Sequence, residues 1–151
     1  MPKLSVWMIR ASMIHMGVGF LFGAVILWQK GLPFAGWVWR LLNPHIELMV
    51  AGWTLQLVMG VAFFILPRFA NRNNRYGAEY LGWWSFFLLN SGLCLTVLGY
   101  WFFLPTVALA GRLLEMVAVM NYVVMIFPRI KPVALDMATK KQYMISNQEN
   151  S

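Results

Sequence analysis

Four long apolar stretches dominate this sequence and restrict it to a membrane-spanning helical fold. A helix needs about 20 residues to cross a hydrocarbon layer of ~30 Å. The stretches that reach this length are residues 11–29, 45–66, 80–103 and 106–127. They are too long for the strands of a membrane barrel, and backbone groups in lipid must bond within their own segment. We therefore predict an all-α fold: an integral membrane antiparallel four-helix bundle over residues 1–132, followed by a polar cytoplasmic tail over 133–151.

The composition supports a membrane protein and excludes several other classes. Hydrophobic residues make up 60% of the chain and charged residues only 11%, whereas soluble domains carry roughly 25% charged residues. The one cysteine, Cys94, excludes a disulfide within the chain and a zinc site built on cysteine spacing. The first apolar stretch lacks a small-residue cleavage site, so we expect it to span the membrane rather than to be removed as a signal peptide.

Glycine, proline and asparagine mark the ends of the apolar stretches. Asn43 is a good N-cap and Pro44 suits a first helical turn, so this pair is expected to begin the second helix. The short turn at Pro105 requires the third and fourth helices to be antiparallel neighbours. The aromatic loop 31–43 is expected to lie on the outer membrane surface. The remaining breaks are Gly31, Pro33, Pro67 and Pro128.

Lysine and arginine are unevenly distributed between the two ends of the predicted spans. Nine of the twelve lie at one end, and only Lys30 and Arg40 lie at the other. Cytoplasmic loops are enriched in these residues, so we predict a multi-pass protein of a bacterial or archaeal inner membrane with both termini cytoplasmic. The positive charge is then a topology signal and a contact with the lipid bilayer, not a nucleic-acid site. The nine residues are Lys3, Arg10, Arg68, Arg72, Arg75, Arg129, Lys131, Lys140 and Lys141.

Arg112 and Glu115 lie inside the fourth stretch, three positions apart and therefore on one helix face. An unpaired arginine in lipid costs at least ~2.5 kcal/mol, so we expect a carboxylate, either Glu47 or Glu115, to hold Arg112. Glu47 also complements the helix dipole at the start of the second helix. We interpret these residues as a structural polar clasp between helices, with a proton relay as the alternative.

The chain has two histidines, and we expect them to lie far apart. His15 is placed about one turn inside the cytoplasmic end of the first helix, and His45 at the outer end of the second. Most of the membrane would then separate them, which excludes one iron held by both. We interpret His15 as an interior hydrogen-bonding residue. His45 is either a helix-start residue in the headgroup layer or a haem ligand.

Small residues predict close helix contacts. Gly19 and Gly23 form a G-x-x-x-G pattern in the first stretch, and Gly52, Gln56 and Gly60 repeat at four-residue spacing in the second. Such faces pack against a neighbouring helix, either within the bundle or across a dimer. Gln56 is also a polar residue in the middle of its stretch.

The segment 44–69, PHIELMVAGWTLQLVMGVAFFILPRF, combines His45 with a Gly-Trp pair at 52–53 and a Leu-Pro-Arg exit at 66–68. It resembles a helix in subunit I of haem-copper oxidases of the cytochrome-c-oxidase and nitric-oxide-reductase group, and in related small membrane proteins of the nitric-oxide-response type. Residues 1–32 also resemble the first span of small four-helix relatives of that subunit.

In that family a histidine at the outer end of this helix ligates a haem, and His45 matches the first histidine of a pair. Glu47 stands where the second would be, which is a departure from the family pattern. The family's other haem and copper histidines have no counterpart in a chain with only two histidines. The resemblance therefore does not imply a complete oxidase or reductase, and whether the chain is an enzyme stays open.

The resemblance implies a small haem-b-binding protein of the respiratory chain, with electron transfer as its activity. His45 is the candidate axial ligand, and His15 is a less favoured one. The second axial position could come from Met49, from Met116, from His45 of a second chain in a homodimer, or from a larger respiratory complex. A periplasmic electron carrier is the expected partner. The alternatives are a structural or assembly subunit without haem, and a proton or solute carrier using Glu115 and Arg112.

Overall fold

The computed structural model describes residues 2–66, 78–130 and 142, and within these residues every regular element is a helix. Four of its helices are long and apolar enough to cross a membrane, as the sequence predicted. The first is α1 (Lys3–Gly31) and the third is α4 (Glu79–Trp101). The second joins η1 (Gly36–Leu41), α2 (Leu42–Glu47), η2 (Leu48–Leu55) and α3 (Gln56–Ile65), and the fourth joins α5 (Pro105–Ile126) and η3 (Phe127–Arg129).

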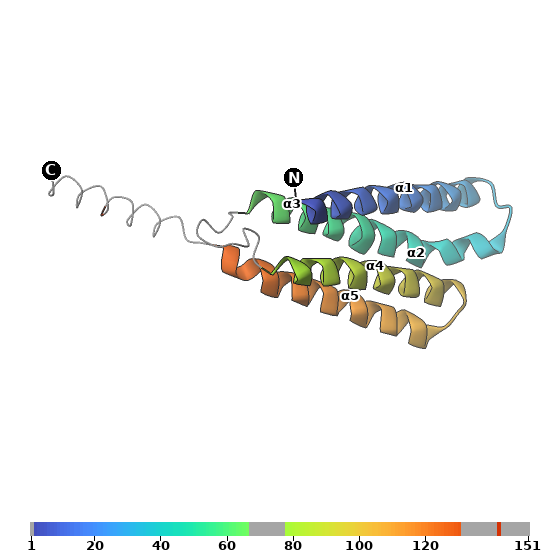
Figure 1. The fold of residues 1–151 in the computed structure, drawn as a ribbon. Coiled ribbons are helices and arrows are strands. Elements are labelled where there is room, and N and C mark those ends of the chain that lie inside the picture. The colour runs from blue at the N-terminus through green and yellow to red at the C-terminus, as the bar shows by residue number, and fades with distance from the viewer. Residues whose placement is uncertain (1, 67–77, 131–141, 143–151) are drawn as a thin grey trace.

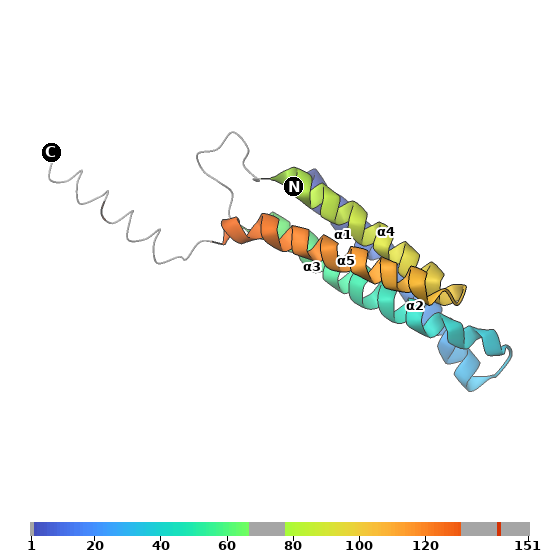
Figure 2. The same cartoon turned by 90° about the horizontal axis from the view of Figure 1, so that it is seen from below.

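The helices form two hairpins that lie side by side (Figures 1 and 2). α1 packs on the composite second helix, and α4 packs on α5. The chain reverses within both hairpins at the same end, which we call the turn end. The opposite end, where α1 begins and α5 finishes, is called the terminal end. Ser5 near the start of α1 donates a hydrogen bond to the Gly60 carbonyl in α3, so the contacts within this hairpin run in opposite order along its two helices.

Two helices begin earlier than the sequence predicted. α1 begins at Lys3 rather than at residue 11, and the second span begins with the 3-10 helix η1 at Gly36. Val38 and Leu41 are buried against Ile26, and this packing makes the expected interfacial loop helical. The prediction that Asn43 is an N-cap is wrong, because it lies inside α2, after Leu41, which already has helical dihedral angles.

The helix ends follow the proline signals. α1 ends at Gly31, and α3 ends at Ile65, one residue before the extended Leu66 (ψ 144°). A residue that precedes proline, here Pro67, avoids the helical region. Pro105, expected in the turn between the third and fourth helices, instead occupies the first turn of α5. The turn before it contains Phe103 with φ 56°, a left-handed conformation uncommon for a bulky residue.

The middle of the second span contains a feature that the sequence did not indicate, a π-helix over Leu48–Leu55. π-helical turns close through i to i+5 hydrogen bonds and are frequent at functional sites. The Thr54 hydroxyl reinforces this wide turn by donating to the Met49 carbonyl, five residues earlier, at 2.9 Å. The irregular segment lies against α1, where both histidines of the chain make their contacts.

Arg129 closes the terminal end of the bundle instead of belonging to an exposed cytoplasmic tail. Its side chain is 1% exposed and donates to the carbonyls of Phe63 and Leu66 at 3.1 and 2.8 Å. These carbonyls belong to the last turn of α3, where no backbone donor follows in the helix. The other predicted loop and tail charges (Arg68, Arg72, Arg75, Lys131, Lys140, Lys141) lie outside the described residues, as does the tail 133–151 apart from Gln142.

Candidate functional site

His45 lies on α2 and points its imidazole at a glycine-rich face of α1. Its Nδ1 lies 2.7 Å from the carbonyl oxygen of Gly19. A Cβ atom added at Gly23 would come within 2.9 Å of His45 Cε1, so the absence of a side chain there makes room for the ring. Gly19 similarly faces the Sδ atom of Met49. The G-x-x-x-G pattern is therefore a contact within the bundle, and it receives His45 and Met49.

The Gly19 contact determines which nitrogen of His45 is free for other chemistry. A carbonyl oxygen only accepts, so Nδ1 carries the hydrogen, and Nε2 of a neutral ring then holds the lone pair. The ring borders an apolar cavity of about 470 Å³ between α1 and α2. Its other walls include Phe20, Ala24, Leu27 and Leu42. The arrangement can direct a neutral imidazole at a large apolar ligand.

His15 makes a similar contact one step along the same seam. Its Nδ1 lies 3.2 Å from the carbonyl oxygen of Gly52, in the π-helix. The predicted separation of the two histidines is wrong, because α1 begins at Lys3 and His15 lies near its middle. His15 is four residues from Gly19, the contact of His45, and four residues span about 6 Å along a helix. Both imidazoles thus occupy the seam between α1 and the second span, His45 from α2 and His15 against η2.

Gln56 and Trp53 add buried polar atoms near the His15 contact. The Gln56 side chain is fully buried, and within the described part of the chain its Nε2 and Oε1 have no hydrogen-bond partner. The same holds for the Nε1 atom of Trp53, one turn away on the π-helix. Buried polar groups are normally bonded to protein or to ordered water. The seam is therefore more polar than its apolar sequence suggests.

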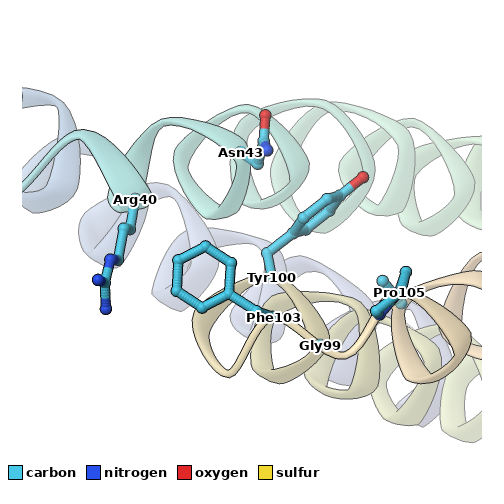
Figure 3. A pocket seen from close by; sticks show the side chains of 7 residues that line it. Arg40, Asn43, Gly99, Tyr100, Phe103 and Pro105 are labelled. Carbon is cyan, nitrogen blue, oxygen red and sulfur yellow. The ribbon is translucent and has the colours of Figure 1, made fainter. Parts of the chain in front are cut away.

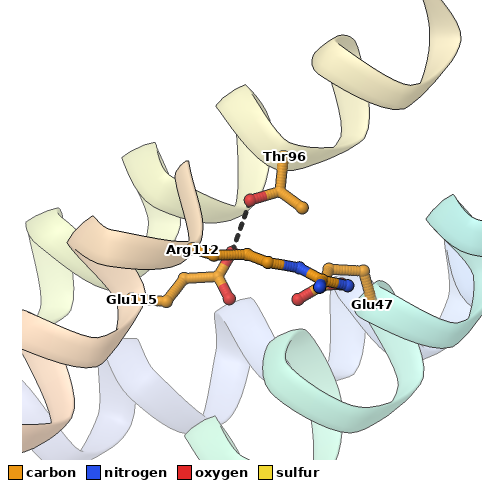
Figure 4. A network of polar contacts seen from close by, with 4 residues as sticks. All are labelled: Glu47, Thr96, Arg112 and Glu115. Carbon is orange, nitrogen blue, oxygen red and sulfur yellow. Dashed lines mark hydrogen bonds and ion pairs between the residues drawn. The ribbon is translucent and has the colours of Figure 1, made fainter. Parts of the chain in front are cut away.

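A second polar cluster links the two hairpins (Figure 4). The expected ion pair is present: Arg112 on α5 donates to Glu47 on α2 at 3.4 Å. Glu115, one turn further along α5, accepts a hydrogen bond from the buried Thr96 hydroxyl on α4 at 3.0 Å. Nothing in the sequence singles out Thr96, because threonine is ordinary in an apolar helix.

The structure separates the two methionine candidates. Met49 lies one turn from His45 and packs on Gly19, so its sulfur belongs to the same seam. Met116 is 59% exposed on α5, and α5 packs mainly on α4. In the described residues no group of three or more His, Cys, Asp or Glu side chains could hold a metal ion. The potential ligand groups that the structure places in this seam include His45, His15 and Met49.

The arrangement thus consists of an imidazole seam between α1 and the second span, and a charged clasp joining that span to α5. The seam borders an apolar cavity. The clasp residues of α5 lie in the half of that helix that is closer to the turn end. Comparisons of the chain with protein-family models, with curated proteins and with solved structures give no match.

Proposed function

We propose that the chain is a small membrane protein that binds haem b through His45 and transfers electrons in a respiratory chain. The observation that carries the proposal is the position of His45, hydrogen-bonded through Nδ1 to the Gly19 carbonyl at the wall of an apolar cavity. A hydrogen bond from one ring nitrogen to a carbonyl fixes the tautomer and orients the other nitrogen toward a metal. The resemblance of residues 44–69 to a haem-ligating helix points to the same residue.

The residues around His45 fit a porphyrin better than a small polar ligand. The cavity walls carry aromatic and aliphatic side chains, among them Phe20, Leu27 and Leu42. Haem is held by axial ligation and by apolar contacts to the macrocycle, and this site offers one imidazole and an apolar wall. Gly23 keeps the ring seat open, since a side chain there would displace the imidazole.

The protein's own contribution would be orientation, burial and a low dielectric constant. When bound, haem b supplies a reversible one-electron couple. His45 would hold the haem iron through Nε2, and the Gly19 carbonyl would increase the basicity of the ring. Met49, on η2 one turn from His45, is a further candidate to hold the group; a second chain or a partner subunit could also supply a ligand.

The four apolar helices support insertion in a membrane, and the charge distribution supports an orientation with both termini in the cytoplasm. The turn end then faces outward, and a haem near His45 would lie within reach of a periplasmic electron carrier. Reporter fusions at Lys3 and at Ser151 test this orientation. Both should give a cytoplasmic signal, and a periplasmic signal from either would contradict it.

Haem binding is tested with three purified proteins: the parent, His45→Ala and His15→Ala. The measurements are the visible spectra of oxidised and reduced protein and the amount of haem per protein. We expect haem in the parent and in His15→Ala, and loss of haem in His45→Ala. His15→Ala is a matched control because it removes a similar imidazole-to-carbonyl contact from the same seam. Full haem retention in His45→Ala contradicts the proposal.

A structural or assembly subunit without haem is the second candidate function. It is favoured by one observation: both imidazoles already contact backbone carbonyls of a neighbouring helix, which is a sufficient structural role for each. Under this alternative the parent protein contains no haem, and His45→Ala and His15→Ala lower its thermal stability by similar amounts. The same three proteins therefore distinguish the two functions.

A further inference from the structure

A cavity of about 370 Å³ lies at the turn end, on the far side of the second span from the haem site proposed above. Its walls come from η1, from the first turn of α2, from the last turn of α4, from the turn that follows it and from the first turn of α5 (Figure 3). The polar residues among them are Arg40, Asn43 and Tyr100, and the aromatic ring of Phe103 lies beside them. The cavity thus combines polar side chains with an apolar wall.

Two guanidinium groups stack on aromatic rings of this cavity. Arg40 Cζ lies 4.6 Å from the centre of the Phe103 ring. Arg112 Cζ lies 5.5 Å from the centre of the Tyr100 ring, one turn deeper in the bundle. Stacking orients a guanidinium by its face and leaves N–H donors along its edge. The ring beside Arg40 belongs to Phe103, the residue with the left-handed backbone in this turn.

These guanidinium groups retain donors for an anion. Arg112 shares its charge with Glu47 through a single contact of 3.4 Å, and its side chain is 55% exposed. A guanidinium has five N–H donors, so one such contact leaves most of them available. Among the described carboxylates, none forms an ion pair with Arg40. The positive charge is therefore least compensated at the mouth of the cavity.

The position of the cavity relative to the membrane indicates which class of anion it binds. It lies where the apolar helices end, which is the depth of phospholipid phosphates around a spanning bundle. Exposed apolar side chains of the same turn, Phe102, Phe103 and Leu104, lie next to it. Arginine matches phosphate oxygens in a bidentate manner, so the phosphate of a phospholipid headgroup suits these guanidinium groups.

We propose that this cavity binds the headgroup of an anionic phospholipid. Arg40 contacts the phosphate, and Arg112, whose guanidinium lies over the Tyr100 ring beside the cavity, adds positive charge. The Asn43 amide and the Tyr100 hydroxyl supply further hydrogen-bonding groups. The acyl chains lie along the apolar side chains of the α4–α5 turn. The site is independent of haem, because it uses a different cavity and different residues.

The test measures lipid binding to the full chain purified in detergent. Phosphatidylglycerol and phosphatidylcholine with identical acyl chains are added, and bound lipid is counted by native mass spectrometry. We expect at least a tenfold preference for phosphatidylglycerol in the parent and a loss of at least fivefold in that preference for Arg40→Gln. Arg10→Gln, the same charge change on an exposed residue near the terminal end, should keep the parent's preference.

Two further variants and one competitor complete the test. Tyr100→Phe keeps the stacking ring and removes the hydroxyl, so it should weaken the preference about twofold without affecting the fold. Arg112→Gln should weaken it further, with helical content measured in parallel. The proposal is overturned if the parent shows no preference for phosphatidylglycerol over phosphatidylcholine. It is equally overturned if Arg40→Gln keeps the parent's preference. It is also overturned if inorganic phosphate at equal concentration displaces the lipid, because the site would then recognise a free anion.

Discussion

The two helical hairpins of this chain are joined internally by different kinds of contact. Between α4 and α5 the backbones touch: a Cβ atom at Gly99 would come within 2.5 Å of the Ala108 nitrogen, and one at Gly111 within 2.6 Å of the Gly92 carbonyl oxygen. Between α1 and the second span, glycines face side chains instead. Gly23 faces the His45 ring, and Gly52 faces His15.

This difference assigns separate roles to the two hairpins. Glycine-on-backbone packing brings helices together and leaves no room for a ligand, as in other membrane helix pairs. Imidazoles inserted between helices instead bring nitrogen atoms into an apolar seam, and a cavity lies beside one of them. Glycine therefore allows close backbone contact between α4 and α5, where backbone atoms lie opposite. Between α1 and the second span it makes room for imidazole rings, because side chains lie opposite.

The largest expected effect is a loss of stability in the closed hairpin. Gly111→Ala and Gly99→Ala place a methyl group against backbone atoms that belong to a neighbouring helix and cannot rotate away. Overpacking of this kind costs about 1–3 kcal/mol, and we expect the upper part of that range. Thermal unfolding in detergent measures it. Gly17→Ala is the control, because nothing lies within 4 Å of its Cβ; equal melting temperatures for all three would contradict close packing.

The second effect concerns the open seam. Gly23→Ala places a methyl group 2.9 Å from His45 Cε1, and a side chain can yield where a backbone cannot. We therefore expect the fold to persist and the imidazole to move, with haem affinity falling about tenfold, or ~1.4 kcal/mol. Haem titration of Gly23→Ala and Gly17→Ala measures this difference. Unchanged affinity in a folded Gly23→Ala protein would show that the ring position does not control binding.

Much of the fold could be predicted because apolar length is a strong signal. The four spans and the breaks at Gly31 and Pro105 follow from residues that act locally. The starts of the helices could not be predicted, because burial of Val38 and Leu41 against Ile26 makes a predicted loop helical. The π-helix at Leu48–Leu55 packs against α1 and has no recognisable local pattern in the sequence.

The sequence predicted a contact of the candidate site only where the energetic cost of an unpaired charge in lipid left few possible partners. An arginine in an apolar helix needs a carboxylate, so Arg112 could be assigned to Glu47 or Glu115 before the contact was known. The positions of His15 and His45 depend instead on the register between two helices. An error in the start of α1 placed His15 too close to the membrane surface and hid the shared seam.

The third effect tests the clasp that joins the hairpins. Thr96→Val removes the hydroxyl that donates to Glu115 and keeps the shape of the side chain. Hydrogen bonds between membrane helices contribute about 0.6 kcal/mol on average and up to about 1.7, and we expect about 1 here because Thr96 is fully buried. Thr96→Ser retains the donor and should cost less.

Replacing both carboxylates extends this test of the clasp. Glu47→Gln and Glu115→Gln should each lower the melting temperature, and the double variant should lower it further. If the double variant and the parent have the same melting temperature, the clasp does not stabilise the bundle.

The smallest expected effect separates the two methionines. Met116 is 59% exposed on α5, so Met116→Leu exchanges side chains of similar size at a surface position and should change stability by less than about 0.5 kcal/mol. Met49 packs on Gly19 beside His45, so Met49→Leu replaces the sulfur in the seam itself. We expect the spectrum of reduced haem to be unchanged in Met116→Leu and altered in Met49→Leu, because only Met49 lies in the histidine seam. A spectral change confined to Met116→Leu would show that α5 reaches the haem, and the division of roles between the two hairpins would then be wrong.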